Sequence, residues 1–137
     1  MTTAPAITIN ERQIGPGYPA YVVAEVSANH NQDFDQAVKL IHAAKGAGAD
    51  AVKVQTYTPD TLTIPSDHEP FRISSGTLWD GQILYELYRG AFMPWEWQPK
   101  LQSVARGLGI DFFRRRTMLR RWNSWRGLAY PSTRCLV

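Results

Sequence analysis

Apolar and polar residues alternate at the start of the chain and then give way to a short apolar run. The alternation from Ile7 to Ile14, around a turn, predicts a short hairpin or an edge element. The segment Tyr21–Ser27 is almost continuously apolar and rich in β-forming residues, which is typical of a strand buried on both faces in a parallel sheet. Glu25 is the one charge that interrupts it.

A helix and a second strand follow. Asp33 and Gln36 have the spacing of a capping box, which marks the start of a helix. The next apolar residues recur on one helical face: Ala37, Leu40, Ile41 and Ala44. We expect the helix to end within residues 46–48, where glycine adopts the left-handed conformation, and residues 51–57 to form a second buried strand. Together they make a βαβ unit.

The rest of the pattern is a long polar segment, two helices and a third strand. Residues 58–80 are rich in Pro, Ser, Thr and Asp, and so long a loop in a compact domain is usually functional or disordered. Helical periodicity returns over residues 84–91 and 101–108, with a turn at 94–99 between them. A third strand begins at residues 110–113, so the order βαβααβ predicts an α/β protein.

Length and composition narrow the class of protein. The 137 residues suit one domain, and no apolar run approaches the roughly 20 residues that a membrane helix needs. The N-terminus lacks the basic and apolar pattern of a signal peptide, so we expect a cytoplasmic location and no membrane partner. The single Cys135 excludes an internal disulfide and a multi-cysteine zinc site.

The net charge of +3 combines two unlike segments. Residues 1–113 contain eight Lys and Arg against twelve Asp and Glu, a net charge of −4. The last 24 residues contain seven Arg and no acid, a net charge of +7. Such asymmetry ordinarily suggests an acidic body with a basic tail that binds nucleic acid.

Polar groups near the carboxyl ends of the first two predicted strands are the candidates for chemistry. Side chains alternate along a strand, so Glu25 shares a face with Ser27, and Lys53 shares one with Gln55. One interpretation is a pocket into which Glu25, Lys53 and Gln55 point, since ligands bind at the carboxyl ends of parallel strands. The other is a buried Glu25–Lys53 ion pair that joins the strands.

Two further groups have an ordinary alternative beside the functional one. Asn29 and His30 follow the first predicted strand, where loops present polar groups to a ligand, although a lone loop histidine is more often simply solvated. The three histidines, His30, His42 and His68, show no metal-ligand spacing. The second group comprises aromatic residues that either line a sugar site or pack helices, and packing is favoured. Its members are Trp79, Tyr85, Tyr88, Phe92, Trp95 and Trp97.

Several of these segments resemble a known family. Ala24–Asn31 and Gly48–Tyr57 are similar to the N-terminal part of the sialic acid synthase family. Four further segments resemble the pseudaminic acid synthase branch of this family: Tyr57–Thr61, Phe71–Ile73, Gly76–Gly81 and Pro94–Trp97. The resemblance spans about residues 7–113, and the matching motifs are specific.

The resemblance implies the N-terminal part of a (β/α)8 TIM barrel and a carbon–carbon bond-forming transferase. Such enzymes condense phosphoenolpyruvate with an open-chain N-acetylated amino sugar, giving a nonulosonic acid, here pseudaminic acid, and phosphate. A divalent metal, Mn or Mg, polarises the sugar aldehyde in the family. The family's metal-binding histidines would follow residue 137, so we expect no metal on this chain, and we expect the parent enzyme to be a homodimer.

The resemblance also implies roles for individual residues. Lys53 would bind the phosphoenolpyruvate anion, Gln55 would help to position the substrates, and Glu25 would hold a sugar hydroxyl or assist proton transfer. Asn29 and His30 would lie at the rim of the pocket. Arg72, in the long polar segment, would meet the sugar.

Length limits what this polypeptide does alone. A (β/α)8 barrel needs about 250 residues, and this chain supplies about three strands, so the barrel is incomplete. We therefore expect activity from the full-length parent and an inactive 137-residue fragment. An N-acetylneuraminate or legionaminate synthase fragment is the alternative within the same class.

The segment 114–137 departs from the family pattern. Small polar residues, a proline, an aromatic residue and Asp should follow Phe113, but an Arg-rich tail follows instead. Because Trp has a single codon, a shifted frame can be traced through Trp122 and Trp125, and it restores acidic and apolar residues of the family type. We expect a frameshift and no native fold for this tail. The alternative is a small nucleic-acid-binding protein that uses the arginines.

Overall fold

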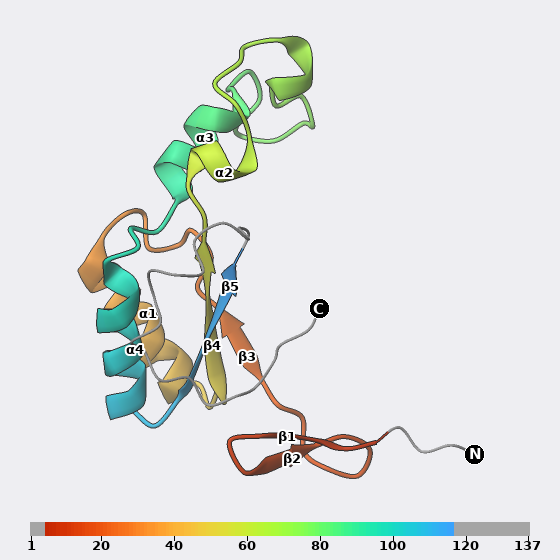
Figure 1. Ribbon diagram of the computed structural model, residues 1–137, viewed down its shortest axis with the longest axis vertical. Coiled ribbons are helices and arrows are strands. Elements are labelled where there is room, and N and C mark those ends of the chain that lie inside the picture. The colour runs from red at the N-terminus through yellow and green to blue at the C-terminus, as the bar shows by residue number, and fades with distance from the viewer. Residues whose placement is uncertain (1–4, 117–137) are drawn as a thin grey trace.

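A hairpin and a three-stranded parallel sheet form the framework of the computed structural model, which describes residues 5–116. The strands are β1 (Ile7–Ile9), β2 (Arg12–Ile14), β3 (Val23–Glu25), β4 (Ala51–Thr56) and β5 (Asp111–Arg116). The helices are α1 (Phe34–Gly46), α2 (Pro59–Leu62), the 3-10 turn η1 (Glu69–Phe71), α3 (Leu84–Ala91) and α4 (Trp97–Gly107). β1 and β2 pair antiparallel, whereas β3, β4 and β5 pair parallel in that order (Figure 1).

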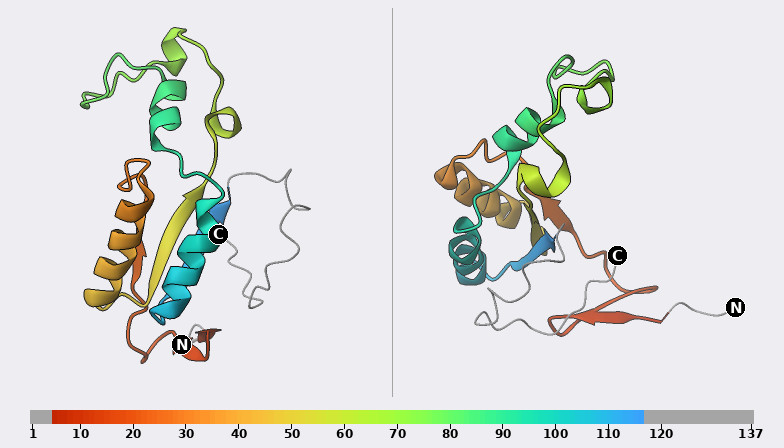
Figure 2. Two further views of the ribbon diagram at one scale, coloured as in Figure 1. Left: turned by 90° about the vertical axis from the view of Figure 1, so that its left-hand side faces the viewer. Right: turned by 45° about the horizontal axis from the view of Figure 1, so that its top comes forward.

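Helices α1 and α4 cover one face of the parallel sheet (Figure 2). Val52 and Val54 of β4 point into this layer and are fully buried. They pack in one cluster with Ile41 of α1 and with Leu101 and Ala105 of α4, which are fully buried too. Burial of such side chains is the main favourable term in folding, so this layer is the core of the described chain.

The boundaries of α1 follow from local chemistry. Oδ1 of Asp33 accepts hydrogen bonds from the backbone N–H groups of Asp35 and Gln36, which confirms the expected start of the helix. The helix ends at Gly46, and Gly48 then adopts a φ of +83°, which glycine tolerates without a steric penalty. The chain is thereby turned into β4.

A polar network closes the amino end of the sheet. Asp50 precedes β4, and its Oδ2 accepts a hydrogen bond from the backbone N–H of Val22 at 2.7 Å. Its Oδ1 pairs with Arg12 of β2, which also donates to the carbonyl of Ala20. The hairpin is therefore attached to the sheet by an ion pair, as well as by Asn10, which donates to Asp111 at the start of β5.

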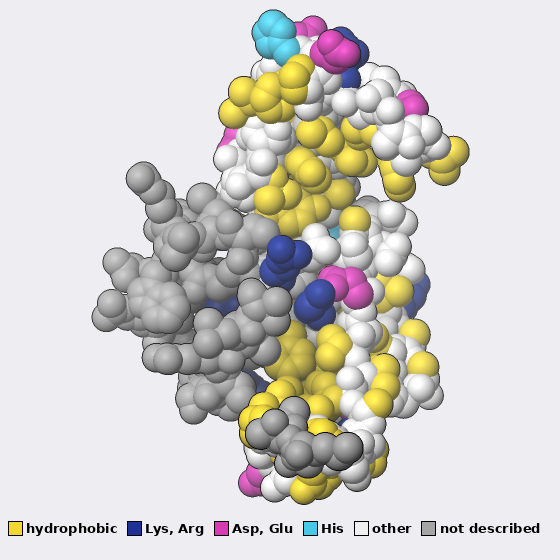
Figure 3. Space-filling view, turned by 90° about the vertical axis from the view of Figure 1, so that its right-hand side faces the viewer, with side chains coloured by type: hydrophobic (Ala, Val, Ile, Leu, Met, Phe, Trp, Pro, Cys, Tyr) yellow, Lys and Arg dark blue, Asp and Glu magenta, His cyan; other side chains and the backbone are white. Residues whose placement is uncertain are grey.

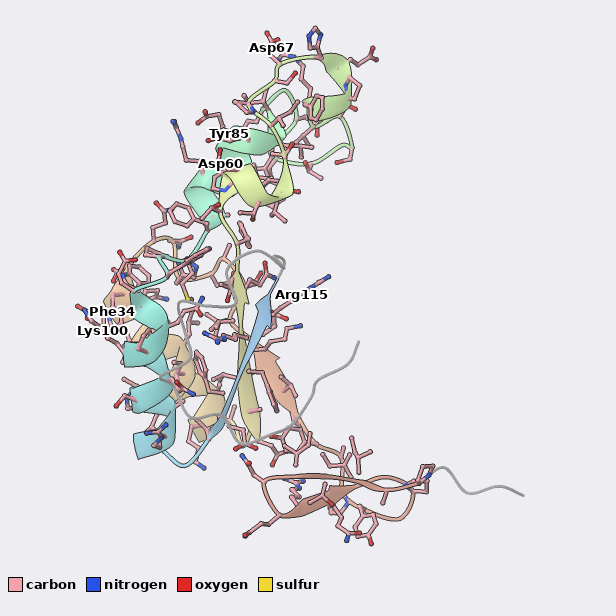
Figure 4. The ribbon with its side chains drawn as sticks, viewed as in Figure 1. Phe34, Asp60, Asp67, Tyr85, Lys100 and Arg115 are labelled. Atoms are coloured by element: carbon pink, nitrogen blue, oxygen red, sulfur yellow. The ribbon has the colours of Figure 1, made fainter. Side chains whose placement is uncertain are left out.

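Residues 58–92 project from the carboxyl end of β4 and contain α2, η1 and α3 (Figure 1). Tyr85 of α3 donates a hydrogen bond to Oδ1 of Asp60 in α2 at 3.0 Å, and Figure 4 shows the two side chains pointing toward each other. Tyr88 meets Tyr57 edge to face. The polar segment expected to be a loop thus contains a short helix and a 3-10 turn.

Three boundaries differ from the expected ones. β3 is only three residues long, and Val22 and Val23 are exposed rather than buried, because β3 is the outer strand of the sheet beside β4 alone. α4 begins at Trp97 and includes Pro99, since the first turn of a helix does not use the N–H that proline lacks. β5 continues to Arg116, beyond the boundary expected at residue 113, because it pairs with β4 along six residues.

The rest of the Arg-rich tail, residues 117–137, lies outside the described residues, and the expectations for it stay predictions. Among residues 5–116, no helix has the length and apolar character needed to cross a membrane.

Candidate functional site

Glu25 and Lys53 meet on the sheet face opposite α1 and α4. They occupy paired positions of β3 and β4, and Nζ of Lys53 forms an ion pair with Oε2 of Glu25. The side chains remain 36% and 39% exposed, respectively. The predicted ion pair between the strands is therefore present, but it is not buried. Both groups stay accessible to a ligand.

Gln55 of β4 and Arg115 of β5 extend this face. Gln55 follows Lys53 by two positions and so lies on the same side of β4, where Arg115 of β5 is its register partner. Arg115 projects away from the helices (Figure 4). Figure 3 views this side of the molecule and shows basic and acidic side chains together among apolar ones. Within residues 5–116, the side chain of Gln55 makes no hydrogen bond, so its amide is available to a bound molecule.

The arrangement has a definite chemical capacity. An ammonium group binds a carboxylate or a phosphate, and a neighbouring amide donates to or accepts from the same ligand. The Glu25 carboxylate balances the charge of Lys53, and a carboxylate of this kind is able to accept a hydrogen bond from a hydroxyl group. The three side chains that the sequence pattern grouped together are thus brought to one face.

Asn29 and His30 both lie in the loop after β3, but they differ in exposure to solvent. Asn29 is exposed, as expected for a residue at the rim of a site. His30, in contrast, is fully buried, so both of its expected positions, at the rim or in solvent, are wrong. Its ring meets Trp97 of α4 edge to face, with 5.8 Å between ring centroids. Trp97 follows His30 by 67 residues, so no local sequence pattern near His30 indicates that Trp97 packs against it.

Arg72 lies apart from the other candidates. Its Nε donates to the carbonyl of Asp67 at 2.8 Å, and its Nη1 donates to the carbonyl of Gly81 at 3.3 Å. Asp67 occupies the far end of the projecting residues in Figure 4. The structure therefore gives Arg72 a part in holding the projecting segment together and does not bring it to Lys53.

The aromatic group divides into packing residues and one exposed residue. Trp97 meets Phe34 and His30 edge to face, and Tyr88 meets Tyr57 in the same way. Nε1 of Trp95 donates to the carbonyl of Tyr57 at 3.4 Å. Trp79 is exposed, far from these contacts along the chain. Helix packing, the favoured interpretation, accounts for most of the group.

Gln98 is a polar residue that the sequence pattern did not reveal. It is buried at the start of α4, and its Nε2 donates to Oγ1 of Thr56 at the carboxyl end of β4, at 2.8 Å. A glutamine between Trp97 and Pro99 in a segment expected to be a turn gives no periodic signal. Its burial follows only from the earlier start of α4.

A metal site is not formed by the described residues. Within residues 5–116, no three His, Cys, Asp or Glu side chains gather closely enough to hold an ion. Glu25 and its neighbours Lys53 and Gln55 offer a single carboxylate, which is fewer oxygen ligands than Mg or Mn requires. These residues therefore do not fit the metal expected for the full-length enzymes.

Comparison with known proteins decides the family. The model of the NeuB family matches residues 40–117, more than half of the chain, including β4 with Lys53 and Gln55. The chain belongs to the NeuB family. Pseudaminic acid synthase from Helicobacter pylori is 52% identical to it over 95 residues, which are 69% of this chain and 28% of that enzyme. N,N'-diacetyllegionaminic acid synthase from Legionella pneumophila is 34% identical over 98 residues, 72% of this chain and 27% of the relative.

A solved structure agrees on the fold. The N-acetylneuraminic acid synthetase from Leptospira borgpetersenii, solved in complex with citrate, aligns with a TM-score of 0.66 at 23% identity. The alignment covers 84% of this chain and 35% of that one. The expected fold class, the N-terminal part of a (β/α)8 barrel, is confirmed. The chain spans 28% of the length of the Helicobacter pylori relative.

Proposed function

We propose that this NeuB-family chain contributes the first strands of the active site of a pseudaminic acid synthase. The observation that carries the proposal is the accessible Glu25–Lys53 pair, with Gln55 beside it, on a chain that is 52% identical to pseudaminic acid synthases over 95 residues. Identity to the legionaminic acid synthase is lower, at 34% over 98 residues. The parent enzyme would condense phosphoenolpyruvate with an N-acetylated amino sugar.

The reaction balances as one condensation with the uptake of water. The enol carbon of phosphoenolpyruvate attacks the sugar aldehyde and forms the new carbon–carbon bond. Water adds at C2 of the former phosphoenolpyruvate, and the C2–O bond to phosphate breaks. The products are a nonulosonic acid and inorganic phosphate, and no oxidant or reductant is consumed.

The described residues serve this reaction by binding and orientation. Lys53 carries the positive charge that holds the phosphate or carboxylate of phosphoenolpyruvate, and the Gln55 amide fixes its orientation. Glu25, released from Lys53 as the anion binds, accepts a hydrogen bond from a sugar hydroxyl or holds the proton of the attacking water. Phosphoenolpyruvate carries up to three negative charges, so further cations from the rest of the barrel complete the site.

A chimera tests the proposal. Residues 7–113 of this chain replace the matching part of the Helicobacter pylori synthase, and the product is assayed with the amino-sugar precursors of pseudaminic, legionaminic and N-acetylneuraminic acids. We expect condensation with the pseudaminic acid precursor. Lys53→Gln should lower kcat/KM about 100-fold or more, as loss of a charge-stabilising group does. Lys39→Gln, an exposed lysine of α1, is the matched control and should leave it unchanged.

The outcomes separate the parts of the proposal. A folded chimera without activity, or equal activity of the Lys53→Gln and Lys39→Gln variants, contradicts the role of this face. Preference for another precursor contradicts the assigned product. The 137-residue polypeptide alone should form no product, because a (β/α)8 barrel needs about 250 residues; product formed by it contradicts that expectation.

A further inference from the structure

Arg115 lies on the same face of the sheet as the Glu25–Lys53 pair. It is the register partner of Gln55, and Phe113, two residues before it, is the register partner of Lys53. Side chains two residues apart on a strand point to the same side, so Arg115 and Phe113 share the side of Gln55 and Lys53. Arg115 is exposed and projects away from α1 and α4 (Figure 4).

Strand pairing brings Arg115 within reach of a ligand held by Lys53. The two residues are diagonal neighbours, one strand across and two positions further along. Paired strands lie about 4.8 Å apart and rise about 3.3 Å per residue, which puts the two Cα atoms about 8 Å apart. Long side chains on such diagonal positions reach a common partner. The Lys53 ammonium and the Arg115 guanidinium therefore stand on either side of the Gln55 amide, on a face where basic side chains are accessible (Figure 3).

The carboxylates of this face are engaged with other groups. Glu25 pairs with Lys53. Asp111, at the start of β5 and on the same side of the strand, accepts a hydrogen bond from the hydroxyl group of Tyr21. In the described part of the chain, the Arg115 side chain makes no ion pair or hydrogen bond. Its charge is therefore not neutralised there, and an anion is the partner that a guanidinium binds best.

We propose that Lys53, Gln55 and Arg115 form a binding site for a small molecule that carries two anionic groups, a phosphate and a carboxylate. The planar guanidinium of Arg115 donates two parallel hydrogen bonds to the phosphate. The ammonium of Lys53 holds the carboxylate, and the amide of Gln55 donates between them. Phosphoenolpyruvate has this pair of groups. Its assignment as the ligand rests on the function proposed above, whereas a site for such an anion does not.

Arg115 is a feature of this chain and does not follow from the family resemblance, in which small polar residues come after Phe113. A small polar side chain offers one hydrogen bond, whereas arginine adds a full charge and a second donor. Two cations on one face let the 137-residue chain hold the anion without the rest of a barrel. Because both cations are exposed, added salt weakens the binding.

Titration of the ¹⁵N-labelled 137-residue chain with phosphoenolpyruvate, followed by nuclear magnetic resonance, tests the site. We expect the amide resonances of Gln55 and Arg115 to shift. The Kd should rise about fivefold in Lys53→Gln and in Arg115→Gln, the scale of one exposed ion pair. Arg115→Lys keeps the charge without the planar fork and should lose less. Two matched controls should leave the Kd unchanged: Arg106→Gln on an exposed position of α4, and Arg126→Gln in the Arg-rich segment.

Two further probes test whether both ends of the ligand are held. Inorganic phosphate and pyruvate each carry one of the two anionic groups, so each should bind about fivefold more weakly than phosphoenolpyruvate. Arg115→Gln should weaken the binding of phosphate and leave that of pyruvate unchanged. Lys53→Gln should do the reverse. Equal Kd values for phosphoenolpyruvate and phosphate overturn the two-ended site.

The outcomes distinguish this site from diffuse attraction and from the proposed function. Absence of resonance shifts, or an equal effect of Arg115→Gln and Arg126→Gln, overturns the site. Weaker binding in Lys53→Gln alone also overturns it and leaves the proposed function intact. The chimera described above carries residues 7–113 and so lacks Arg115. If both variants weaken binding to the 137-residue chain but Lys53→Gln leaves the activity of the chimera unchanged, the proposed function fails and the two-cation site stands.

Discussion

Charged residues at the two ends of the sheet have different surroundings. At the amino end, Asp50 is held by the backbone of Val22 and by Arg12. At the carboxyl end, within residues 5–116, the Lys53 ammonium pairs with Glu25, and the side chain of Gln55 makes no hydrogen bond. In (β/α)8 barrels the carboxyl end carries catalysis and the amino end carries stability. The distribution of side-chain partners in this chain agrees with that division, and it supports the proposed role of the Glu25–Lys53 face.

Asp50→Asn should lower the stability of the chain in a pH-dependent way. The hydrogen bond from the Val22 backbone, followed by Arg12, lowers the pKa of Asp50 below its ordinary value of 3.8. A lowered pKa means that the ionised carboxylate stabilises the fold above pH 3.8 and that this contribution is lost as the pH falls through the folded-state pKa. The Tm of Asp50→Asn should therefore lie below that of the parent chain at pH 7, and the gap should narrow below pH 4.

Glu69→Gln is the control for this measurement. Glu69 is exposed in the projecting segment. The Tm of Glu69→Gln should therefore stay close to the Tm of the parent chain at every pH between 3 and 7. Thermal melts followed by circular dichroism at several pH values give the comparison. A gap for Asp50→Asn that stays constant over this range contradicts the assigned role of the carboxylate.

Helix α1 shows how much of an element its sequence determines. Its start, its end and its buried face follow from Asp33, Gly48 and Ile41, which are local signals. The start of α4 was predicted incorrectly, because Pro99 signals a turn unless its place in the first helical turn is known. β5 extends through three arginines because the backbone of β4 offers hydrogen bonds along six residues, and the composition of the segment does not reveal this.

The candidate site also has some features that follow from local sequence patterns and others that depend on distant contacts. Alternation along two strands placed Glu25, Lys53 and Gln55 on one face, because the period of a strand is local and parallel pairing aligns its neighbours. Burial of His30 depends on Trp97, and the partner of Gln98 is Thr56, 42 positions away. Contacts between distant segments are not encoded in any short pattern, which explains why the buried polar residues beside the site went unrecognised.

Asp33→Ala should destabilise the chain through α1. The Asp33 carboxylate satisfies two backbone N–H groups that have no partner within the helix. Its removal should cost about 1 kcal/mol, which lowers the Tm by about 4 °C in a domain of this size. Asp33→Asn keeps an acceptor oxygen and should lose much less. Equal melting temperatures for the alanine and asparagine variants, measured by circular dichroism, contradict the capping role.

At the scale of the whole molecule, stability is unevenly distributed. The core cluster comes from the sheet and from helices α1 and α4, with Met93 at the approach to α4. Within residues 60–92 no side chain is fully buried, and exposed apolar residues include Leu62, Ile64 and Leu78. Segments with few buried apolar contacts open locally without unfolding of the core. The projecting residues and the core are therefore expected to open separately.

Hydrogen–deuterium exchange provides the measurement, and Tyr85→Phe provides the perturbation. Amides of α2 and α3 should exchange faster than those of β4 and α1, and by about tenfold or more, since each 1.4 kcal/mol of opening free energy changes the rate tenfold. Tyr85→Phe removes the hydrogen bond to Asp60 but keeps the ring, so it should speed exchange in α2 and α3 and leave β4 unchanged.

Tyr57→Leu is the contrasting variant, because Tyr57 is buried where β4 meets the projecting segment and packs against Tyr88. Its replacement removes a contact shared by both parts and should speed exchange in α3 and at the end of β4 together. If Tyr85→Phe instead accelerates β4 and α1 as much as α3, the chain opens as one cooperative unit. The projecting segment would then open only together with the sheet, which would contradict the expected separate opening.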